Sequence, residues 1–252
     1  MGNVIELKNI IKRFPVDENS CSLNEQEREG FFYALDDISL FVEENECIII
    51  AGANGCGKSL LMSIIAGLEE PTSGTVFTSG KTGLIFQEPD AQILGETPRE
   101  DIAFGPRNMR LSKNEILKRI EAALEQTGLI KKADFPSHSL SGGEKRRLAA
   151  AGVLAMDLQI IIFDEPYANL DYPGIKQVNQ LLQKLKAAGK TVIILTHELE
   201  KCLALALRVI ILSKGKKVFD GCVNDALSFD LESCGIRNPL RKTALAVEDL
   251  LW

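Results

Sequence analysis

The sequence predicts an α/β fold organised around a mainly parallel β-sheet. Short apolar runs alternate with helical segments along most of the chain, and such runs are typical of parallel strands that helices cover on both faces. The middle of the chain, from Arg99 to Thr127, breaks this alternation with a stretch rich in Glu, Lys, Arg and Leu. We therefore expect a separate helical subdomain beside the sheet.

The individual elements follow from these patterns in chain order. Strands are expected at residues 4–11, 38–42, 46–50, 75–77, 83–86, 160–163, 191–195 and 209–212. Helices are expected at residues 60–67, within 99–127, and at 142–156, 173–188 and 198–206. The helix at 173–188 starts with Pro173 and is followed by Gly189, which matches the residue preferences of helix termini. The acid-rich stretch 16–30 is expected to be an exposed loop.

The composition restricts the class of protein. The chain has 252 residues, 45% of them hydrophobic, which suits one large domain or a domain with a small subdomain. The net charge of −6 provides no basic stripe, so we expect no nucleic-acid partner. Six scattered cysteines without a C-x-x-C pair predict neither a zinc site nor a disulfide framework. No signal peptide or membrane span is recognisable, so we expect a soluble, cytoplasmic chain.

Residues Gly52–Ser59 match the phosphate-loop pattern G-x-x-x-x-G-K-[ST]. An apolar run precedes the pattern and a helix-compatible run follows it, which is the context that this motif requires. Glycines let backbone N–H groups surround an anion, and the helix N-terminus adds partial positive charge. We expect Lys58 to reach the β- and γ-phosphates and Ser59 to ligate Mg²⁺. The full set assigned to the nucleotide is Asn54, Gly55, Cys56, Gly57, Lys58, Ser59 and Leu60.

Cys56 lies inside this loop. The helix N-terminus could lower the pKa of its thiol, although a neutral, space-filling role is the favoured interpretation.

Two acids, Asp164 and Glu165, follow the apolar run at 160–163. Ligands bind at the carboxyl ends of the strands in open α/β sheets. Two adjacent acids after a buried strand are costly unless a cation or a proton-accepting role accompanies them. We therefore expect Asp164 to hold Mg²⁺ through a water molecule and Glu165 to orient or deprotonate an attacking water.

The segment Leu140–Glu144 has a serine followed by two glycines at the start of a predicted helix. This arrangement makes a second phosphate-binding helix terminus. The pattern is weak alone, because Ser and Gly are common helix caps. Its position just ahead of the strand that ends in Asp164 makes it specific.

Taken together in their order along the chain, the phosphate loop, Leu140–Glu144 and the pair Asp164 and Glu165 resemble the motifs of an ATP-binding cassette (ABC) ATPase. The resemblance covers residues 4–220. The resemblance implies a P-loop NTPase core with a mainly parallel sheet, an antiparallel β subdomain and a helical subdomain that carries the signature motif. The expected organisation is a single domain, with a nucleotide-binding core at 1–86 and 158–220, helices at 87–157 and a short C-terminal helical segment at 221–252. ATP and Mg²⁺ are the implied cofactors.

The resemblance also implies roles for further residues. Gln87 stands where the family has a glutamine that contacts Mg²⁺ and the attacking water, and His197 where it has a histidine that senses the γ-phosphate. With Glu165, these are the expected catalytic residues. Asp171 stands in a segment, Asn169–Asp171, that resembles the family's loop for communication across the dimer, and it is assigned to the nucleotide site on that basis. Three positions, Glu144, Tyr167 and Asn169, depart from the commoner family pattern.

The family works as a pair of cassettes that close head to tail over two ATP molecules. The resemblance therefore implies that Ser141, Gly142 and Gly143 of one copy cap the nucleotide that Lys58 of the other copy holds. For the adenine, Phe14 aligns with the stacking aromatic. The alternatives left open are Phe31, Phe32 and Tyr33.

The segments Phe86–Ile93 and Asp101–Pro106 narrow the resemblance to the energy-coupling factor (ECF) ATPases of vitamin and of cobalt or nickel importers. This implies a motor at the cytoplasmic face of the membrane. Its partners would be a second ATPase copy or a paralogue, a polytopic coupling subunit and a substrate-binding membrane subunit. The alternative is a soluble ABC-type mechanoenzyme, although the chain has neither the long coiled coil of repair members nor the two cassettes of translation factors. A catalytically silent cassette and a P-loop kinase are disfavoured by the retained motifs.

Overall fold

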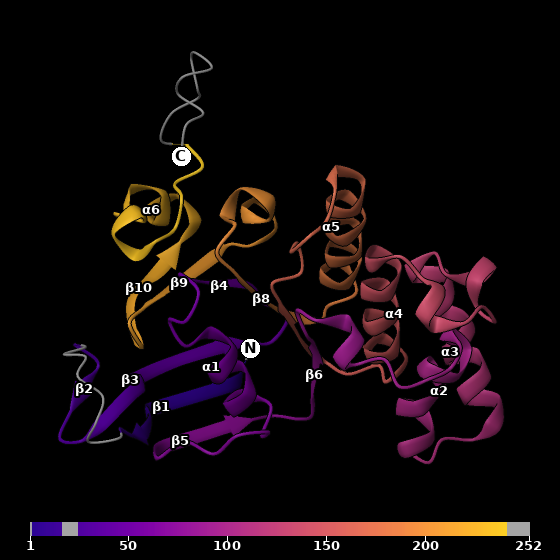
Figure 1. The fold of residues 1–252 in the computed structure, drawn as a ribbon, viewed down its shortest axis with the longest axis horizontal. Helices are drawn as coiled ribbons and strands as arrows, with labels where there is room; N and C mark the ends of the chain where they lie inside the picture. Colours follow the sequence, from indigo (N-terminus) through magenta and orange to yellow (C-terminus); the bar gives the residue numbers. More distant parts are fainter. Residues whose placement is uncertain (1, 17–24, 241–252) are drawn as a thin grey trace.

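The computed structural model describes residues 2–16 and 25–240 and arranges them in two β-sheets and a group of helices (Figure 1). One sheet has four strands in the order β2-β3-β1-β5, and the other has six in the order β10-β9-β4-β8-β7-β6. The predicted α/β class, with a mainly parallel sheet, an antiparallel sheet and a helical subdomain, is confirmed.

The six-stranded sheet forms the centre of the molecule. Its strands are β6 (Thr82–Ile85), β7 (Ile160–Asp164), β8 (Thr191–Thr196), β4 (Cys47–Ala51), β9 (Arg208–Ser213) and β10 (Lys216–Cys222). Neighbouring strands are parallel except for β9 and β10. Ala51 pairs with Thr196 and Asp164 pairs with Leu195, so β4, β8 and β7 end at one edge of the sheet. The residues that follow these three strands are therefore neighbours.

Successive residues of β4 face opposite sides of this sheet, as the period of a strand requires. Ile49 packs in the core on the side of helix α5 (Tyr172–Ala187). Ile48 and Ile50 pack in a second core with helix α1 (Lys58–Ile65) and the antiparallel sheet. The central strands are thus apolar on both faces, which explains their uninterrupted apolar runs.

The antiparallel sheet contains β1 (Asn3–Pro15), β2 (Glu27–Arg28), β3 (Phe31–Glu43) and β5 (Ser73–Thr78). Buried side chains of β1 and β3, such as Leu7 and Leu40, join the core beneath α1. Asp36 N in β3 donates a backbone hydrogen bond to Gly215 O, which links this sheet to the turn between β9 and β10.

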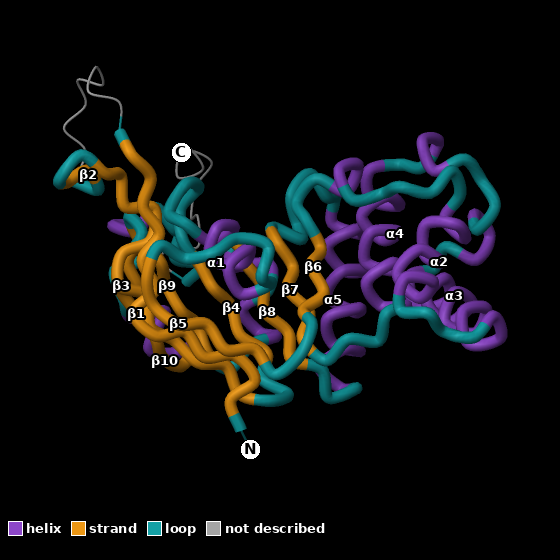
Figure 2. The backbone as a smooth tube through the Cα atoms, turned by 90° about the horizontal axis from the view of Figure 1, so that it is seen from below, coloured by secondary structure: helices purple, strands orange, loops and turns teal. Residues whose placement is uncertain are grey.

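The helical subdomain consists of α2 (Pro98–Asn108), α3 (Lys113–Thr127) and α4 (Gly142–Ala155). Figures 1 and 2 show these helices grouped beyond β6, at the opposite end from β2 and β10. They enclose a core of their own that includes Ile102, Leu124 and Leu148. The predicted helical stretch 99–127 is divided at Arg110, whose φ of 58° a right-handed helix does not accommodate.

Several local predictions need correction. Residues 198–206 form two 3₁₀ turns, Leu199–Lys201 and Leu203–Leu205, rather than one helix. The hairpin strand β10 and the first half of β3 were not predicted. The C-terminal part contains the short helix α6 (Val223–Ser228) and a 3₁₀ turn at Glu232–Cys234. Residues 17–24 of the acid-rich stretch and residues 241–252 lie outside the described residues, and Glu27–Arg28 of that stretch are paired as β2.

Among the described residues, no helix combines the length and the apolar character that crossing a membrane demands.

Candidate active site

The phosphate loop connects β4 to α1, as the motif predicts. Two of its glycines are required by close packing. A Cβ atom at Gly52 would lie 2.5 Å from the Leu212 carbonyl oxygen, and one at Gly57 would lie 2.9 Å from the Ala34 carbonyl oxygen. Gly57 also has a φ of 107° and precedes the first turn of α1. The loop therefore holds its backbone against β3 and β9, where a side chain on either glycine would push it away.

Cys56 fills the space beneath the loop. Its side chain is 5% exposed, and its sulfur would lie 2.4 Å from a Cβ atom on Gly52. Burial raises the pKa of the Cys56 thiol, so the suggested lowering by the helix terminus is wrong, because desolvation outweighs the nearby Lys58. Cys56 is thus a neutral packing residue. The other described cysteines, Cys47, Cys202, Cys222 and Cys234, are also free thiols.

Lys58 brings the loop and the end of β7 together. Its ammonium nitrogen donates to the carbonyls of Gly52 at 2.7 Å and Ala53 at 3.1 Å. The same nitrogen lies 3.5 Å from Glu165 Oε1, and the lysine is only 5% exposed. A cation so poorly solvated is available to a phosphate group that enters the loop.

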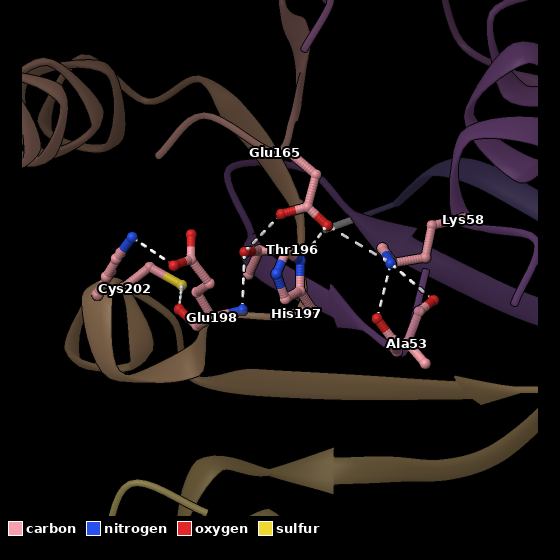
Figure 3. Close-up of polar contacts among 9 residues, drawn as sticks. Ala53, Lys58, Glu165, Thr196, His197, Glu198 and Cys202 are labelled. Carbon is pink, nitrogen blue, oxygen red and sulfur yellow. Dashed lines mark hydrogen bonds and ion pairs between the residues drawn. The ribbon is translucent and has the colours of Figure 1, made fainter. Parts of the chain in front are cut away.

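Glu165 is the centre of a cluster of hydrogen bonds that Figure 3 shows in full. One carboxylate oxygen lies 2.9 Å from His197 Nδ1, and the other accepts a hydrogen bond from the Thr196 hydroxyl at 3.0 Å. The residue is 4% exposed and has a φ of 44°. The predicted pair Glu165 and His197 is therefore in direct contact. Thr196 was not predicted, because nothing in a lone threonine signals such a role.

Asp164 is buried one residue before Glu165, at the end of β7. Burial raises the pKa of Asp164, and a hydrogen bond with the predicted Mg²⁺ ligand Ser59 offsets part of that rise. Its Oδ1 atom is buried and has no hydrogen-bond partner. An unpaired buried carboxylate oxygen next to a hydroxyl fits a hard divalent cation, whose ligands are oxygens.

The predicted signature motif, Leu140–Glu144, lies at the start of helix α4 and contains a complete capping box. Ser141 Oγ accepts from the Glu144 backbone N–H, and the Glu144 carboxylate accepts from the Ser141 N–H at 2.9 Å. The ion-paired hydrogen bond with Lys132 lowers the pKa of Glu144 to about 2, so the group stays ionised. A glutamate therefore suits this position, since its carboxylate caps the helix and pairs with Lys132.

Ser141–Gly143 and the phosphate loop are not joined within one chain. No hydrogen bond among the described residues links Ser141 or Gly143 to Lys58 or Ser59. Ser141 is exposed at the start of its helix. Within the described residues, the two segments therefore have no direct polar contact.

Arg146 is a connecting residue that the sequence did not reveal. Its guanidinium donates to the backbone carbonyls of Pro166, Ala168 and Gln87, the last at 2.8 Å. The predicted Gln87 is itself exposed. Arg146 thus joins α4, the loop after Glu165 and the segment that begins at Gln87, and only contacts between distant parts of the chain reveal this.

Two other predicted residues occupy clear positions. Asp171 caps α5, with its side chain accepting from Gly174 N at 2.9 Å. Phe14 lies on β1 and is 43% exposed, opposite Phe32 on β3. Of the alternatives, Tyr33 is buried and Phe31 lies under the Arg13 guanidinium at 4.2 Å. Among the four candidates, Phe14 is therefore the most exposed.

Comparison with known proteins agrees with this geometry. A family model described as ABC transporter matches residues 35–168. The chain belongs to the ABC transporter family. Its ATPase motifs and this membership identify it as an ATPase of the family, which binds and hydrolyses ATP.

The relatives place this ABC ATPase in the energy-coupling factor group. It is 39% identical over 235 residues to the energy-coupling factor transporter ATP-binding protein EcfA of Carboxydothermus hydrogenoformans. The aligned residues cover 86% of this chain and 87% of that protein. It is 39% identical over 228 residues to the cobalt import ATP-binding protein CbiO of Rhodobacter capsulatus, covering 84% of this chain and 81% of that protein.

Solved structures show the same fold. The cbiO1 subunit of Clostridium perfringens, described as part of the ABC transporter complex cbiONQ, superposes with a TM-score of 0.77 at 29% identity, covering 92% of this chain and 93% of that one. A dimeric ATP-binding cassette in a post-hydrolysis state with ADP and phosphate gives a TM-score of 0.75 at 28% identity, covering 87% and 98%.

Replacing Asp164 with Asn is expected to stabilise the ABC ATPase when nucleotide and Mg²⁺ are absent. A carboxyl group whose pKa is raised by folding binds more protons in the folded state, so its contribution to stability falls as the pH rises from 3.8 through the raised value. At pH 7 the acid at position 164 therefore contributes less stability than at pH 4, and the neutral amide removes that loss. We expect a rise in Tm of roughly 2–4 °C, equivalent to about 1 kcal/mol.

The measurement is thermal unfolding at pH 7 and near pH 4. The difference in Tm between Asp164→Asn and the unaltered protein should be smaller near pH 4 than at pH 7. The matched control is Asp90→Asn, because Asp90 has a side chain that is 67% exposed and pairs only at the surface with Lys145. An equal or lower Tm for Asp164→Asn at pH 7 would contradict the proposed cost of the buried charge.

Proposed function

We propose that this ABC ATPase is the motor subunit of an importer of the energy-coupling factor type, working as a head-to-tail dimer that holds two ATP molecules. The proposal rests on one observation: the residues assigned to the nucleotide lie in two separate places on the chain. The phosphate loop, Asp164, Glu165 and His197 converge at one edge of the sheet. In the described part of the chain, the exposed Ser141 helix terminus forms no hydrogen bond or ion pair with any of them. A second copy has to supply that terminus to complete the site.

Each side chain then has a defined task. Lys58 and the N–H groups of the loop bind the β- and γ-phosphates, and Ser141 and Gly143 of the second copy cap the γ-phosphate. Ser59, Asp164 and Gln87 would hold Mg²⁺, which supplies charge neutralisation when bound. Phe14 stacks on the adenine ring. Phosphoryl transfer depends mainly on such positioning and charge, so a site divided between two copies ties hydrolysis to their association.

Glu165 and His197 are proposed to handle the attacking water and the γ-phosphate. Glu165 accepts from Thr196 through one oxygen and contacts His197 with the other, which fixes the plane of its carboxylate. A carboxylate held in this way can orient a water molecule and accept its proton. His197 is half-buried beside it, where its second ring nitrogen can meet a phosphate oxygen.

The surface that would meet a membrane subunit is the segment that follows Gln87. Three large apolar side chains are exposed between residues 94 and 109, namely Leu94 at 67%, Phe104 at 51% and Met109 at 39%. Large exposed apolar patches mark protein contacts, so we take these side chains as the candidate contact residues. Because Arg146 ties Gln87 to the loop after Glu165, a change at the nucleotide would reach this surface through a hydrogen-bonded path. The proposed location is therefore the cytoplasmic face of the membrane, alongside a polytopic coupling subunit and a substrate-binding subunit.

Purification from native cells in mild detergent tests this proposal. We expect the chain to copurify with a polytopic membrane subunit, and Phe104→Glu to reduce its recovery at least tenfold without loss of ATP binding. The matched control is Phe77→Glu, because Phe77 is 52% exposed but lies on β5 of the antiparallel sheet. Recovery with only soluble partners would support the soluble mechanoenzyme instead, and equal effects of both substitutions would remove the role of the proposed surface.

A further inference from the structure

Tyr167 is a fully buried tyrosine two residues after Glu165. Its ring packs in the core on the α5 side of the sheet, with Val178, Leu182 and Cys202. Burial raises the pKa of Tyr167 far above its usual range, so its hydroxyl stays protonated. A buried phenol that keeps its proton needs a hydrogen-bond acceptor.

Asn179 in α5 provides that acceptor. The Tyr167 hydroxyl lies 2.7 Å from Asn179 Oδ1, and Asn179 Nδ2 donates to the Lys201 backbone carbonyl at 2.8 Å. The Lys201 carbonyl can only accept, which fixes the orientation of the amide and makes Tyr167 the donor. The tyrosine is therefore connected through α5 to the 3₁₀ turn that follows His197.

From Lys201 the contacts return to the active site. The Lys201 ammonium group pairs with the Glu198 carboxylate, and the Glu198 backbone N–H donates to the Thr196 hydroxyl at 3.0 Å. That hydroxyl donates in turn to Glu165 Oε2 at 3.0 Å. These contacts form a closed network, which we call the circuit. It runs from Glu165 along the chain to Tyr167, then through Asn179 to the turn at Lys201, and it returns to Glu165 through Glu198 and Thr196. His197 lies between the two circuit members Thr196 and Glu198.

This circuit acts on a residue whose backbone needs support. Glu165 has a φ of 44°, in the left-handed region that a glutamate rarely adopts. Such a conformation persists only when its surroundings hold it. The circuit holds the loop after Glu165 from one side and the His197 turn from the other, so it sets how the two side chains face each other.

We propose that Tyr167 is a positioning residue which, through Asn179 and Lys201, keeps the Glu165 carboxylate and the His197 ring in register for hydrolysis. The inference rests on the proposed roles of Glu165 and His197. It also gives a physical meaning to the departure of Tyr167 from the commoner family pattern. The hydroxyl, rather than the ring, carries the effect.

Tyr167→Phe tests the proposal because it removes the hydroxyl and keeps the ring. We expect kcat for ATP hydrolysis by the purified full chain to fall roughly ten- to hundredfold, since small misplacements of catalytic groups have effects of this size. The affinity for a fluorescent ATP analogue should change less than twofold, because no group of the phosphate loop is altered. The matched control is Tyr172→Phe, because Tyr172 is 68% exposed and should leave both quantities unchanged.

A double variant, Tyr167→Phe with Asn179→Leu, separates positioning from stability. Replacing both partners with apolar groups avoids leaving the asparagine oxygen buried and unpaired, so the Tm should recover part of its loss. The remainder reflects the Lys201 carbonyl, which loses its Asn179 donor. The kcat should remain low, because the circuit is still broken. The chain has two histidines, so the ring proton signal of His197 in the NMR spectrum should shift in both variants while that of His138 stays in place.

The outcomes are distinct. An unchanged kcat in Tyr167→Phe, or a kcat that recovers together with the Tm in the double variant, would overturn the positioning role. Glu165→Gln assayed beside them shows whether the underlying assignment holds. If Glu165→Gln retains turnover, the proposed role of Glu165 fails. If Glu165→Gln loses turnover while Tyr167→Phe keeps it, only the positioning role of Tyr167 fails.

Discussion

Glu165→Gln is expected to reduce ATP hydrolysis by about 10² to 10⁴-fold, the usual contribution of a general base, while ATP binding persists. The substitution preserves the size of a side chain that is only 6% exposed. It removes the charge and the proton-accepting oxygen that face His197 at 2.9 Å and Lys58 at 3.5 Å. Bound ATP would then remain intact, and the dimer that closes over it would accumulate.

Single-turnover hydrolysis and light scattering with ATP and Mg²⁺ measure the two effects separately. The matched control is a double variant that carries Gly143→Asp together with Glu165→Gln. A Cβ atom at Gly143 would meet nothing closer than Leu170 at 3.8 Å, so the substitution leaves the fold of one copy undisturbed. In the proposed shared site it would place a carboxylate against the γ-phosphate held by the other copy, so the double variant should bind ATP and remain monomeric. Wild-type turnover in Glu165→Gln would remove this residue from the mechanism, and a monomer with trapped ATP would contradict the shared site.

Lys58→Ala is expected to weaken ATP binding by at least roughly 100-fold, equivalent to about 2.7 kcal/mol. Lys58 is the cation nearest the loop carbonyls, at 2.7 Å from the Gly52 oxygen, and its side chain is almost entirely shielded from water. A hydrogen bond between an ammonium group and a phosphate is stronger in such surroundings than at the surface. Calorimetric titration with ATP gives the affinity directly.

The variant also leaves Glu165 without its nearest cation, and breaking a buried ion pair is destabilising. Lys58→Ala combined with Glu165→Gln removes that unpaired charge, so a loss of affinity in the double variant reports on ATP binding rather than on unfolding. Lys214→Ala serves as the control, because Lys214 is 65% exposed and pairs at the surface with Glu25. Unchanged ATP affinity in both Lys58 variants would exclude the phosphate loop as the binding site.

Motifs that act through local backbone geometry could be predicted from the sequence alone. The phosphate loop needs glycines at set spacings between a strand and a helix, and the structure shows why Gly52 and Gly57 cannot carry a side chain. The capping box at Ser141 and Glu144 spans three residues of one helix. The acids after β7 lie at the end of a buried strand, where a parallel sheet presents its ligand-binding edge.

Contacts between distant segments were not predictable in this way. Arg146 reaches carbonyls 20, 22 and 59 residues away, and Thr196 reaches Glu165 over 31 residues. Neither residue type forms a motif with its neighbours, so the sequence contains no local signal for these contacts. The same reason explains the error at 198–206. The apolar spacing there suits a helix, but the Glu198 N–H is taken by Thr196 and Asn179 binds the Lys201 carbonyl.

The class of fold, the phosphate loop, the two acids and the signature helix could be predicted from the sequence, because each depends on residues close together in the chain. The contacts of Glu165 with Lys58 and His197 became visible only in the folded chain. The same holds for the links from Arg146 to Gln87 and from Tyr167 to the His197 turn. Those relations depend on how the sheet aligns its strand ends and where α4 and α5 pack against it, and packing of this kind is a property of the whole core rather than of any one segment.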